Sequence, residues 1–99
     1  MERRIVKDLI ESLARSGWKP WGVDDGGDQL LRATNKDEAM EAIFAVDDAW
    51  LYFRHADHPK THGVWLIGGN GEDIISDWTY DMRDPDGFHS AMEAATKDA

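Results

Sequence analysis

Three histidines lie close together in the sequence, at His55, His58 and His62, with Asp57 among them. Imidazole nitrogens are common ligands of Zn²⁺ and Ni²⁺. The spacing would place the three rings on one face of a helix, but Pro59 and the surrounding strand and loop pattern exclude a helix here. A structural zinc site also needs four closed ligands. We therefore expect a polar hairpin tip and no bound metal, and keep the three histidines as weak metal candidates.

A second candidate for metal chemistry is the acidic run Asp81, Asp84 and Asp86 before Gly87, which is similar to a fragment of a calcium loop. The complete loop needs alternating oxygen ligands and a bidentate Glu at its twelfth position. Counted from Asp81, that position is Met92, which cannot bind calcium. We instead expect these acids to form a turn and to cap a helix.

Catalytic patterns are missing from the sequence. None of its serines lies in a nucleophile elbow. The turn Gly68–Gly71 is not a phosphate loop, because Glu72 and Asp73 follow where such a loop needs Lys and Ser or Thr. Pairs of carboxylates arise by chance in any chain this acidic. We therefore expect a protein that is not an enzyme and uses no cofactor.

Aromatic residues suggest binding rather than catalysis. The chain has five tryptophans, at 18, 21, 50, 65 and 78. Some must fill the core, and others are the residue type that anchors protein interfaces. Trp50, Tyr52 and Arg54 share one face of a strand, opposite Leu51 and Phe53. Either face could be the one that the helices cover, because the pattern does not fix the register.

The elements that position these residues follow from hydrophobic periodicity. Apolar residues at helical spacing predict helices over 3–16 and 36–45, the second with Asn35 as its N-cap. A last helix is expected to begin with Asp84 as N-cap and Pro85 as its first residue.

Strands are expected between these helices. Residues 18–34 have the composition of a hairpin with a glycine-rich turn. Alternation over 49–56 predicts a strand, 57–62 a loop, and 63–68 a second strand that is apolar on both faces. A short final strand is expected around 73–78.

The order α-β-β-α-β-β-(β)-α defines the α+β class. We expect a single domain over 1–99, with a small antiparallel sheet of four to five strands and three helices packed mainly on one face. The hydrophobic content of 41% is too high for a disordered chain, and the absence of cysteine excludes disulfides and thiolate metal sites.

Charge narrows the set of partners. Twenty acids against 11 bases give a net charge of −9, and residues 1–20 carry five bases against three acids, which leaves −11 on the remainder. This balance argues against nucleic-acid and anionic membrane surfaces and favours a basic protein surface. With no apolar run long enough to span a bilayer, we expect a cytoplasmic protein.

One stretch resembles a known group. Leu66–Thr79 reads LIGGNGEDIISDWT, an apolar strand followed by a Gly-Asn turn and an Ile-Ser-Asp-aromatic-Thr segment. It is similar to small acidic proteins encoded by phages, prophages and other bacterial mobile elements. The resemblance covers 14 of 99 residues and implies no activity. It implies the biology of mobile elements, in which small acidic proteins bind and inhibit host or rival proteins.

Together these patterns predict a non-enzymatic, acidic protein-binding module, such as an inhibitor, an antagonist or an immunity-type protein. The alternative is a homo-oligomeric structural or assembly protein, for example a homodimer; a small-molecule binder or enzyme ranks third. The expected interface combines aromatic residues with acids that have no structural assignment: Trp50, Tyr52, Asp47, Asp48, Glu72, Asp73, Asp77, Trp78 and Asp81.

Overall fold

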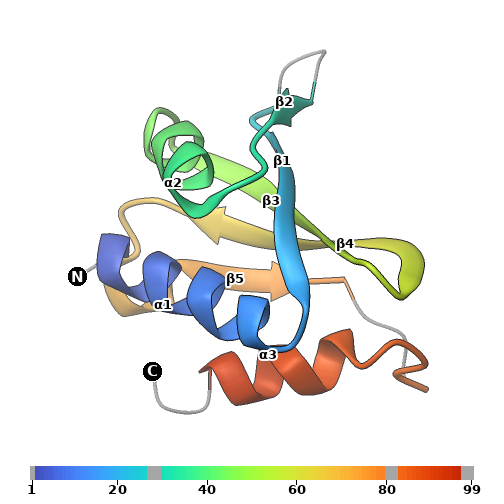
Figure 1. Ribbon diagram of the computed structural model, residues 1–99. Coiled ribbons are helices and arrows are strands. Elements are labelled where there is room, and N and C mark those ends of the chain that lie inside the picture. Colours follow the sequence, from blue (N-terminus) through green and yellow to red (C-terminus); the bar gives the residue numbers. More distant parts are fainter. Residues whose placement is uncertain (1, 27–29, 80–82, 97–99) are drawn as a thin grey trace.

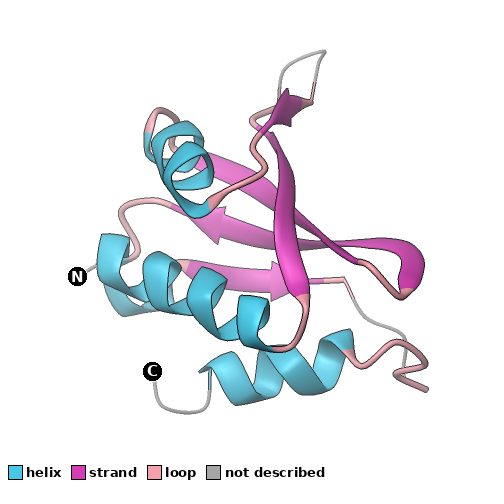
Figure 2. Ribbon diagram, viewed as in Figure 1, coloured by secondary structure: helices cyan, strands magenta, loops and turns pink. Residues whose placement is uncertain are grey.

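A five-stranded antiparallel sheet carries helices on one of its faces in the computed structural model, which describes residues 2–26, 30–79 and 83–96 (Figures 1 and 2). The strand order is β2-β1-β3-β4-β5. The elements, in chain order, are α1 (Glu2–Arg15), β1 (Trp18–Asp24), β2 (Leu31–Arg32), α2 (Lys36–Phe44), β3 (Asp48–His55), β4 (His58–Ile67), the short 3₁₀ helix η1 (Gly71–Asp73), β5 (Ile75–Trp78) and α3 (Phe88–Thr96). The expected α+β class and element order are confirmed.

Pairing of β3 with β4 decides which side chains face the helices. Leu51 lies opposite Val64, and the side chains of both are fully buried. Trp50 lies opposite Trp65, and because successive residues of a strand point to opposite faces, this pair is on the other side of the sheet. The question left open by the sequence is thereby answered: Phe53, like Leu51, is at 0% exposure under the helices.

The three helices supply the second layer of the core. Each buries one apolar stripe, as its periodicity predicts. The buried residues are Val6, Leu9, Ile10 and Leu13 of α1, Ala39 and Ile43 of α2, and Phe88, Ala91 and Met92 of α3. Helices α1 and α3 run side by side in Figure 1, where both lie on the near side of the sheet. None of the described helices has the length and apolar character needed to cross a membrane.

The cap expected for α2 is present. Asn35 is its N-cap, and its side-chain oxygen accepts a hydrogen bond from the backbone N–H of Glu38 at 2.9 Å. The carboxylate of Glu38 in turn accepts a hydrogen bond from the side-chain nitrogen of Asn35, also at 2.9 Å. These bonds satisfy N–H groups that a helix start otherwise leaves unpaired.

The largest differences from the expected boundaries are at the starts of β4 and α3, and the final strand begins at Ile75 because Asp73 lies in η1. The segment 57–62 is not a loop, because β4 begins at His58 and pairs with β3 from there on. Helix α3 begins at Phe88, so Pro85 is not its first residue. Asp84 has φ +47 and lies outside the helix, yet its carboxylate accepts hydrogen bonds from the backbone N–H groups of His89 (2.9 Å) and Ser90 (3.2 Å). Asp84 therefore caps the helix through its side chain, but it is not the N-cap residue, because it lies four residues before the helix begins.

Gly17 ends α1 in a conformation that favours glycine, and it also makes room for a side chain. Its φ is +88, and a Cβ added there would clash with the ring of His55. That ring is held against Trp18, with centroids 5.2 Å apart, and against His58 at 4.8 Å. The ring therefore cannot simply turn away.

We predict that Gly17→Ala lowers the free energy of unfolding by more than the ~1–2 kcal/mol expected from positive φ alone. Gly26→Ala is the matched control, since Gly26 also has φ +88 but has no atom within 4 Å of the added Cβ. Urea unfolding of the two variants measures the difference. Equal losses would show that the contact with His55 adds nothing.

Candidate functional site

No described helix lies on the second face of the sheet, which we call the open face. Its side chains come from β1, β3, β4 and β5. They are Lys19, Trp21 and Asp24 of β1, Asp48, Trp50, Tyr52 and Arg54 of β3, Thr61, Trp65 and Ile67 of β4, and Asp77 of β5. The face is thus built from residues that are distant in sequence and adjacent in register.

One row of residues crosses four strands of the open face. Asp24 lies opposite Trp50, Trp50 opposite Trp65, and Trp65 opposite Asp77. The two indole rings stack, with centroids 5.6 Å apart and planes 21° from parallel. Directly opposed residues of antiparallel strands are close enough for their side chains to interact. The row therefore places an aromatic pair between two carboxylates.

Tyr52 lies beside this row because Gly63, its partner on β4, has no side chain. A Cβ at Gly63 would lie 2.9 Å from the Tyr52 ring and 3.0 Å from that of Trp50, so both rings rest on the sheet at this point. Partial burial, followed by the negative charge of Asp24, raises the pKa of the Tyr52 hydroxyl above its usual value. The negative charge of Asp24 therefore acts on the Tyr52 hydroxyl in addition to burial.

The other end of the open face is basic. The guanidinium group of Arg54 lies over the Trp21 ring at 4.0 Å from its centroid, and that of Arg32 lies over the same ring at 5.0 Å. Arg54 also donates a hydrogen bond from Nε to the Thr61 hydroxyl at 3.1 Å. Cations over an indole face are held by its quadrupole. The face therefore combines an acidic end, an aromatic middle and a basic end.

A hollow opens at the acidic end, which we call the acidic hollow. Its volume is about 220 Å³, and it is lined by Asp24, Asp25, Gly26, Asp48, Ala49, Trp50 and Trp65. Asp24 also accepts a hydrogen bond from the backbone N–H of Gly26 at 2.9 Å, which orients its carboxylate. The combination of indole rings and carboxylates suits a cationic group.

The residues predicted from the sequence as an interface divide into separate groups. Asp48, Trp50, Tyr52 and Asp77 share the open face. Asp47 lies at its end, where its carbonyl accepts a hydrogen bond from Gly68 N–H at 2.6 Å.

The remaining predicted interface residues are elsewhere. Glu72 and Asp73 lie in η1, which packs near α1. Trp78 lies opposite the buried Val64, on the helical side, and its indole N–H donates to Nδ1 of His89 at 3.3 Å. Asp81 falls outside the described residues.

Trp21, Asp24 and Trp65 also belong to the open face, although the sequence pattern did not single them out as interface residues. Trp65 could have been found from the alternation of its strand, but its contact with Trp50 depends on the pairing of β3 with β4.

The three candidate histidines gather around the ring of Trp18. Their ring centroids lie 5.2 Å (His55), 6.0 Å (His58) and 5.3 Å (His62) from that of Trp18. Within the described part of the chain, no group of three or more His, Cys, Asp or Glu side chains is arranged to hold a metal ion. The weak metal candidates are thus aromatic packing partners in this arrangement.

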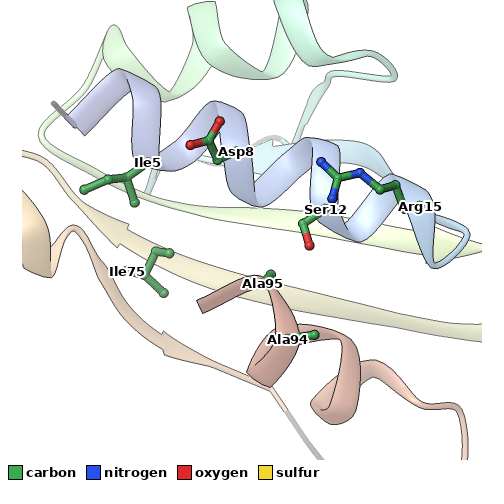
Figure 3. A pocket seen from close by; sticks show the side chains of 7 residues that line it. All are labelled: Ile5, Asp8, Ser12, Arg15, Ile75, Ala94 and Ala95. Carbon is green, nitrogen blue, oxygen red and sulfur yellow. The ribbon is translucent and has the colours of Figure 1, made fainter. Parts of the chain in front are cut away.

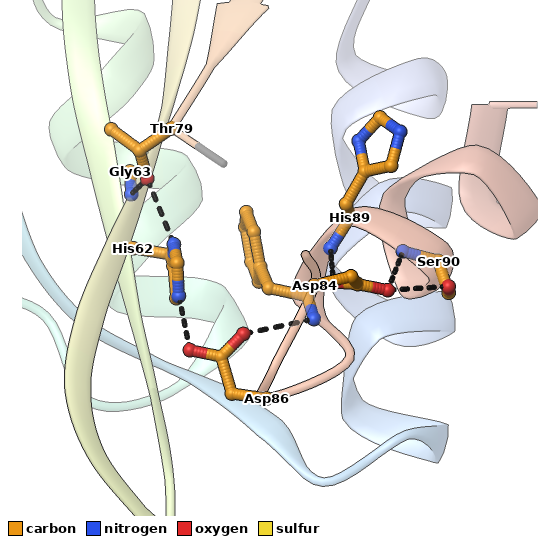
Figure 4. A network of polar contacts seen from close by, with 8 residues as sticks. His62, Gly63, Thr79, Asp84, Asp86, His89 and Ser90 are labelled. Carbon is orange, nitrogen blue, oxygen red and sulfur yellow. Dashed lines mark hydrogen bonds and ion pairs between the residues drawn. The ribbon is translucent and has the colours of Figure 1, made fainter. Parts of the chain in front are cut away.

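His62 is the centre of a buried polar network that the sequence did not reveal (Figure 4). Its Nε2 lies 2.6 Å from Oδ2 of Asp86, and its Nδ1 lies 3.1 Å from the Thr79 hydroxyl. That hydroxyl accepts a hydrogen bond from Gly63 N–H at 2.9 Å. The imidazole ring is only 2% exposed and stacks on Phe88, with centroids 4.4 Å apart. The network therefore ties β4 and the residue after β5 to the start of α3.

A hydroxyl, an imidazole and a carboxylate in this order are also the parts of a catalytic triad. Here the ring is enclosed between Phe88 and Trp18. The arrangement thus has the contacts of a structural tether.

A separate hollow of about 220 Å³ lies between α1, α3 and β5 (Figure 3). It is lined by Ile5, Asp8, Ser12, Arg15, Ile75, Ala94 and Ala95. Ser12 is the one hydroxyl in this lining, and no histidine is present there to act as its base. This lining lacks the nucleophile and base pair that covalent catalysis needs.

Comparisons with known proteins add no relative. No protein-family model, curated protein or solved structure matches the chain. The function of the protein must therefore be inferred from the chemistry of the open face.

Asp86 gives the His62 network a dependence on pH. Burial opposes ionisation of its carboxyl group, but the hydrogen bonds from His62 and from Phe88 N–H outweigh burial and lower its pKa below the usual value. A carboxyl group with a lower pKa in the folded state stabilises the fold above its unfolded pKa of about 4. This contribution disappears as the pH falls through the lower, folded pKa.

We therefore predict that Asp86→Asn lowers the free energy of unfolding by about 1–3 kcal/mol at neutral pH. The variant should lose less stability than the natural protein between about pH 5 and pH 2, because it lacks this carboxyl group. Urea unfolding across this range measures the difference. Asp37→Asn, on the exposed start of α2, is the control for charge. Parallel pH curves for the natural protein and Asp86→Asn would contradict the assignment.

Proposed function

We propose that the protein is a non-enzymatic binding module that docks a basic protein surface through the open face of its sheet. The observation that carries the proposal is the row Asp24, Trp50, Trp65 and Asp77 on a face that no described helix covers. Tryptophan is over-represented among the hot spots of protein interfaces, and the rim around such a core is polar.

Charge and aromatic residues have different tasks in this proposal. The net charge of −9 attracts a basic partner from a distance and raises the rate of encounter. Trp50 and Trp65 then supply apolar area that is desolvated on contact. Their stacking fixes both rings before binding, so little side-chain entropy remains to be lost.

The resemblance to proteins of mobile elements favours an inhibitor, an antagonist or an immunity-type protein within this class. Mimicry of DNA would need carboxylates aligned at the spacing of phosphates. Asp73 lies in η1 and Asp77 in β5, so this segment does not place them along one helix. We therefore favour anchoring by the aromatic row over charge mimicry.

A direct test uses 12-residue peptides that differ only in having Lys and Arg, or Gln, at the same positions. We expect the basic peptides to shift the indole N–H resonances of Trp50 and Trp65 in NMR spectra, and the Gln peptides to leave them unchanged. Asp48→Asn with Asp77→Asn should weaken binding about tenfold or more, since two charge-assisted contacts are removed. Affinity should also fall when salt rises from about 0.05 to 0.3 M.

The matched control is Asp37→Asn with Glu41→Gln, which removes the same charge from α2, on the other side of the sheet. We expect this variant to bind as the natural protein does. If both double variants lose affinity equally, the interaction depends on net charge and not on the open face, and the proposal fails.

A homodimer is the alternative that a specific observation favours. The open face is basic near Lys19 and Arg54 and acidic near Asp24 and Asp48, so two copies related by a twofold axis could pair opposite ends. The net charge of −9 on each copy opposes this pairing.

Salt separates the two possibilities. Salt screens the long-range repulsion between like-charged copies more than it screens charge pairs buried at an interface, so a homodimer should become tighter as salt rises. Sedimentation from about 0.05 to 0.5 M salt measures this dependence. We expect a monomer throughout. A dimer that strengthens with salt and is lost in Trp50→Ala would favour self-association instead.

A further inference from the structure

The acidic hollow has the chemistry of a receptor for one cationic side chain. Trp50 and Trp65, whose indole rings stack on each other, lie in its lining together with the acids Asp24 and Asp48. Its volume of about 220 Å³ has room for the end of one long side chain but not for a folded segment. This combination of a cavity, aromatic walls and negative charge is more than a cluster of acids.

Other aromatic rings of the protein already bind cationic side chains. Arg54 and Arg32 both lie over Trp21, and Arg3 lies over the Phe44 ring at 4.6 Å. Over the described residues, no arginine or lysine of the chain lies on Trp50 or Trp65. Among the described tryptophans of the open face, Trp21 therefore binds two arginine side chains, whereas the stacked pair Trp50 and Trp65 binds none.

We propose that the acidic hollow receives an arginine side chain of the partner. Its guanidinium group stacks against the indole pair of Trp50 and Trp65 and donates hydrogen bonds to Asp24 and Asp48. The inference rests on the proposed function, since it names the residue type through which a basic protein is recognised.

Arginine fits the hollow better than lysine for three physical reasons. A planar guanidinium group stacks on an indole ring, whereas an ammonium group makes only a point contact. Its five N–H donors can serve two carboxylates at once, which suits the lining by Asp24 and Asp48. Its weaker hydration also lowers the cost of leaving water.

The experiment uses small probes, so it does not require the natural partner. Nα-acetyl-arginine amide, Nα-acetyl-lysine amide and Nα-acetyl-citrulline amide are titrated into the full chain, and the indole N–H resonances are followed by NMR. Citrulline has the shape of arginine without its charge. We expect saturable shifts at Trp50 and Trp65 with the arginine probe, with a Kd of order 1 mM as is typical of a single side chain. Lysine should bind at least threefold more weakly, and citrulline should give no saturable shift.

Variants locate the site. Asp24→Asn keeps an oxygen for the turn bond to Gly26 while removing the charge, and together with Asp48→Asn it should weaken arginine binding about tenfold or more. Glu41→Gln, on α2, should not change it. Equal binding of citrulline, an equal or greater affinity for lysine, or shifts centred on Trp21 or Trp78 would each overturn the proposal.

The two proposals can fail separately. Arginine binding that depends on Asp24 and Asp48, with no preference for basic over Gln peptides, would support the receptor and contradict the wider binding module. A preference for basic peptides that needs Trp50 and Asp77 but is insensitive to Asp24→Asn with Asp48→Asn would support the module and contradict the receptor.

Discussion

Register between β3 and β4 is the constraint on which the rest of the structure depends. Leu51 opposite Val64 places both side chains in the core, and the same register places Trp50 opposite Trp65 on the far side. A shift of β3 by one residue would exchange its two faces, so that Trp50 would point toward the helices and Leu51 would be exposed. The burial of apolar side chains under the helices therefore also determines which aromatic residues face outward.

The open face follows from an unequal distribution of helices. All three contribute their apolar stripes to one core, so the sheet has a single covered side. Among the described residues, its other side is covered by side chains of the sheet itself: Trp50 stacks on Trp65, Tyr52 lies over Gly63, and Arg54 lies on Trp21. This layer protects the sheet while leaving rings and charges accessible to a partner, which is the property that the proposed function uses.

The excess of acid has several separate physical uses. Asp84 and Asp86 accept hydrogen bonds from backbone N–H groups at the start of α3, and Asp86 also pairs with the buried His62. These carboxylates stabilise the fold. Asp24, Asp48 and Asp77 instead surround the aromatic row of the open face. The second group is the one whose charge is available for recognition.

The sequence by itself determined the helices, the strands and the α+β class, because each depends on a local period of apolar residues and on caps such as Asn35. It also identified Trp50, Tyr52, Asp48 and Asp77, four residues that share the open face. It could not place Glu72 and Asp73 in η1 or Trp78 toward α3, nor foresee that His62 would bond to Asp86, 24 residues away. Only the tertiary structure decided these, because pairing between strands depends on contacts among residues distant in sequence, which no local period encodes.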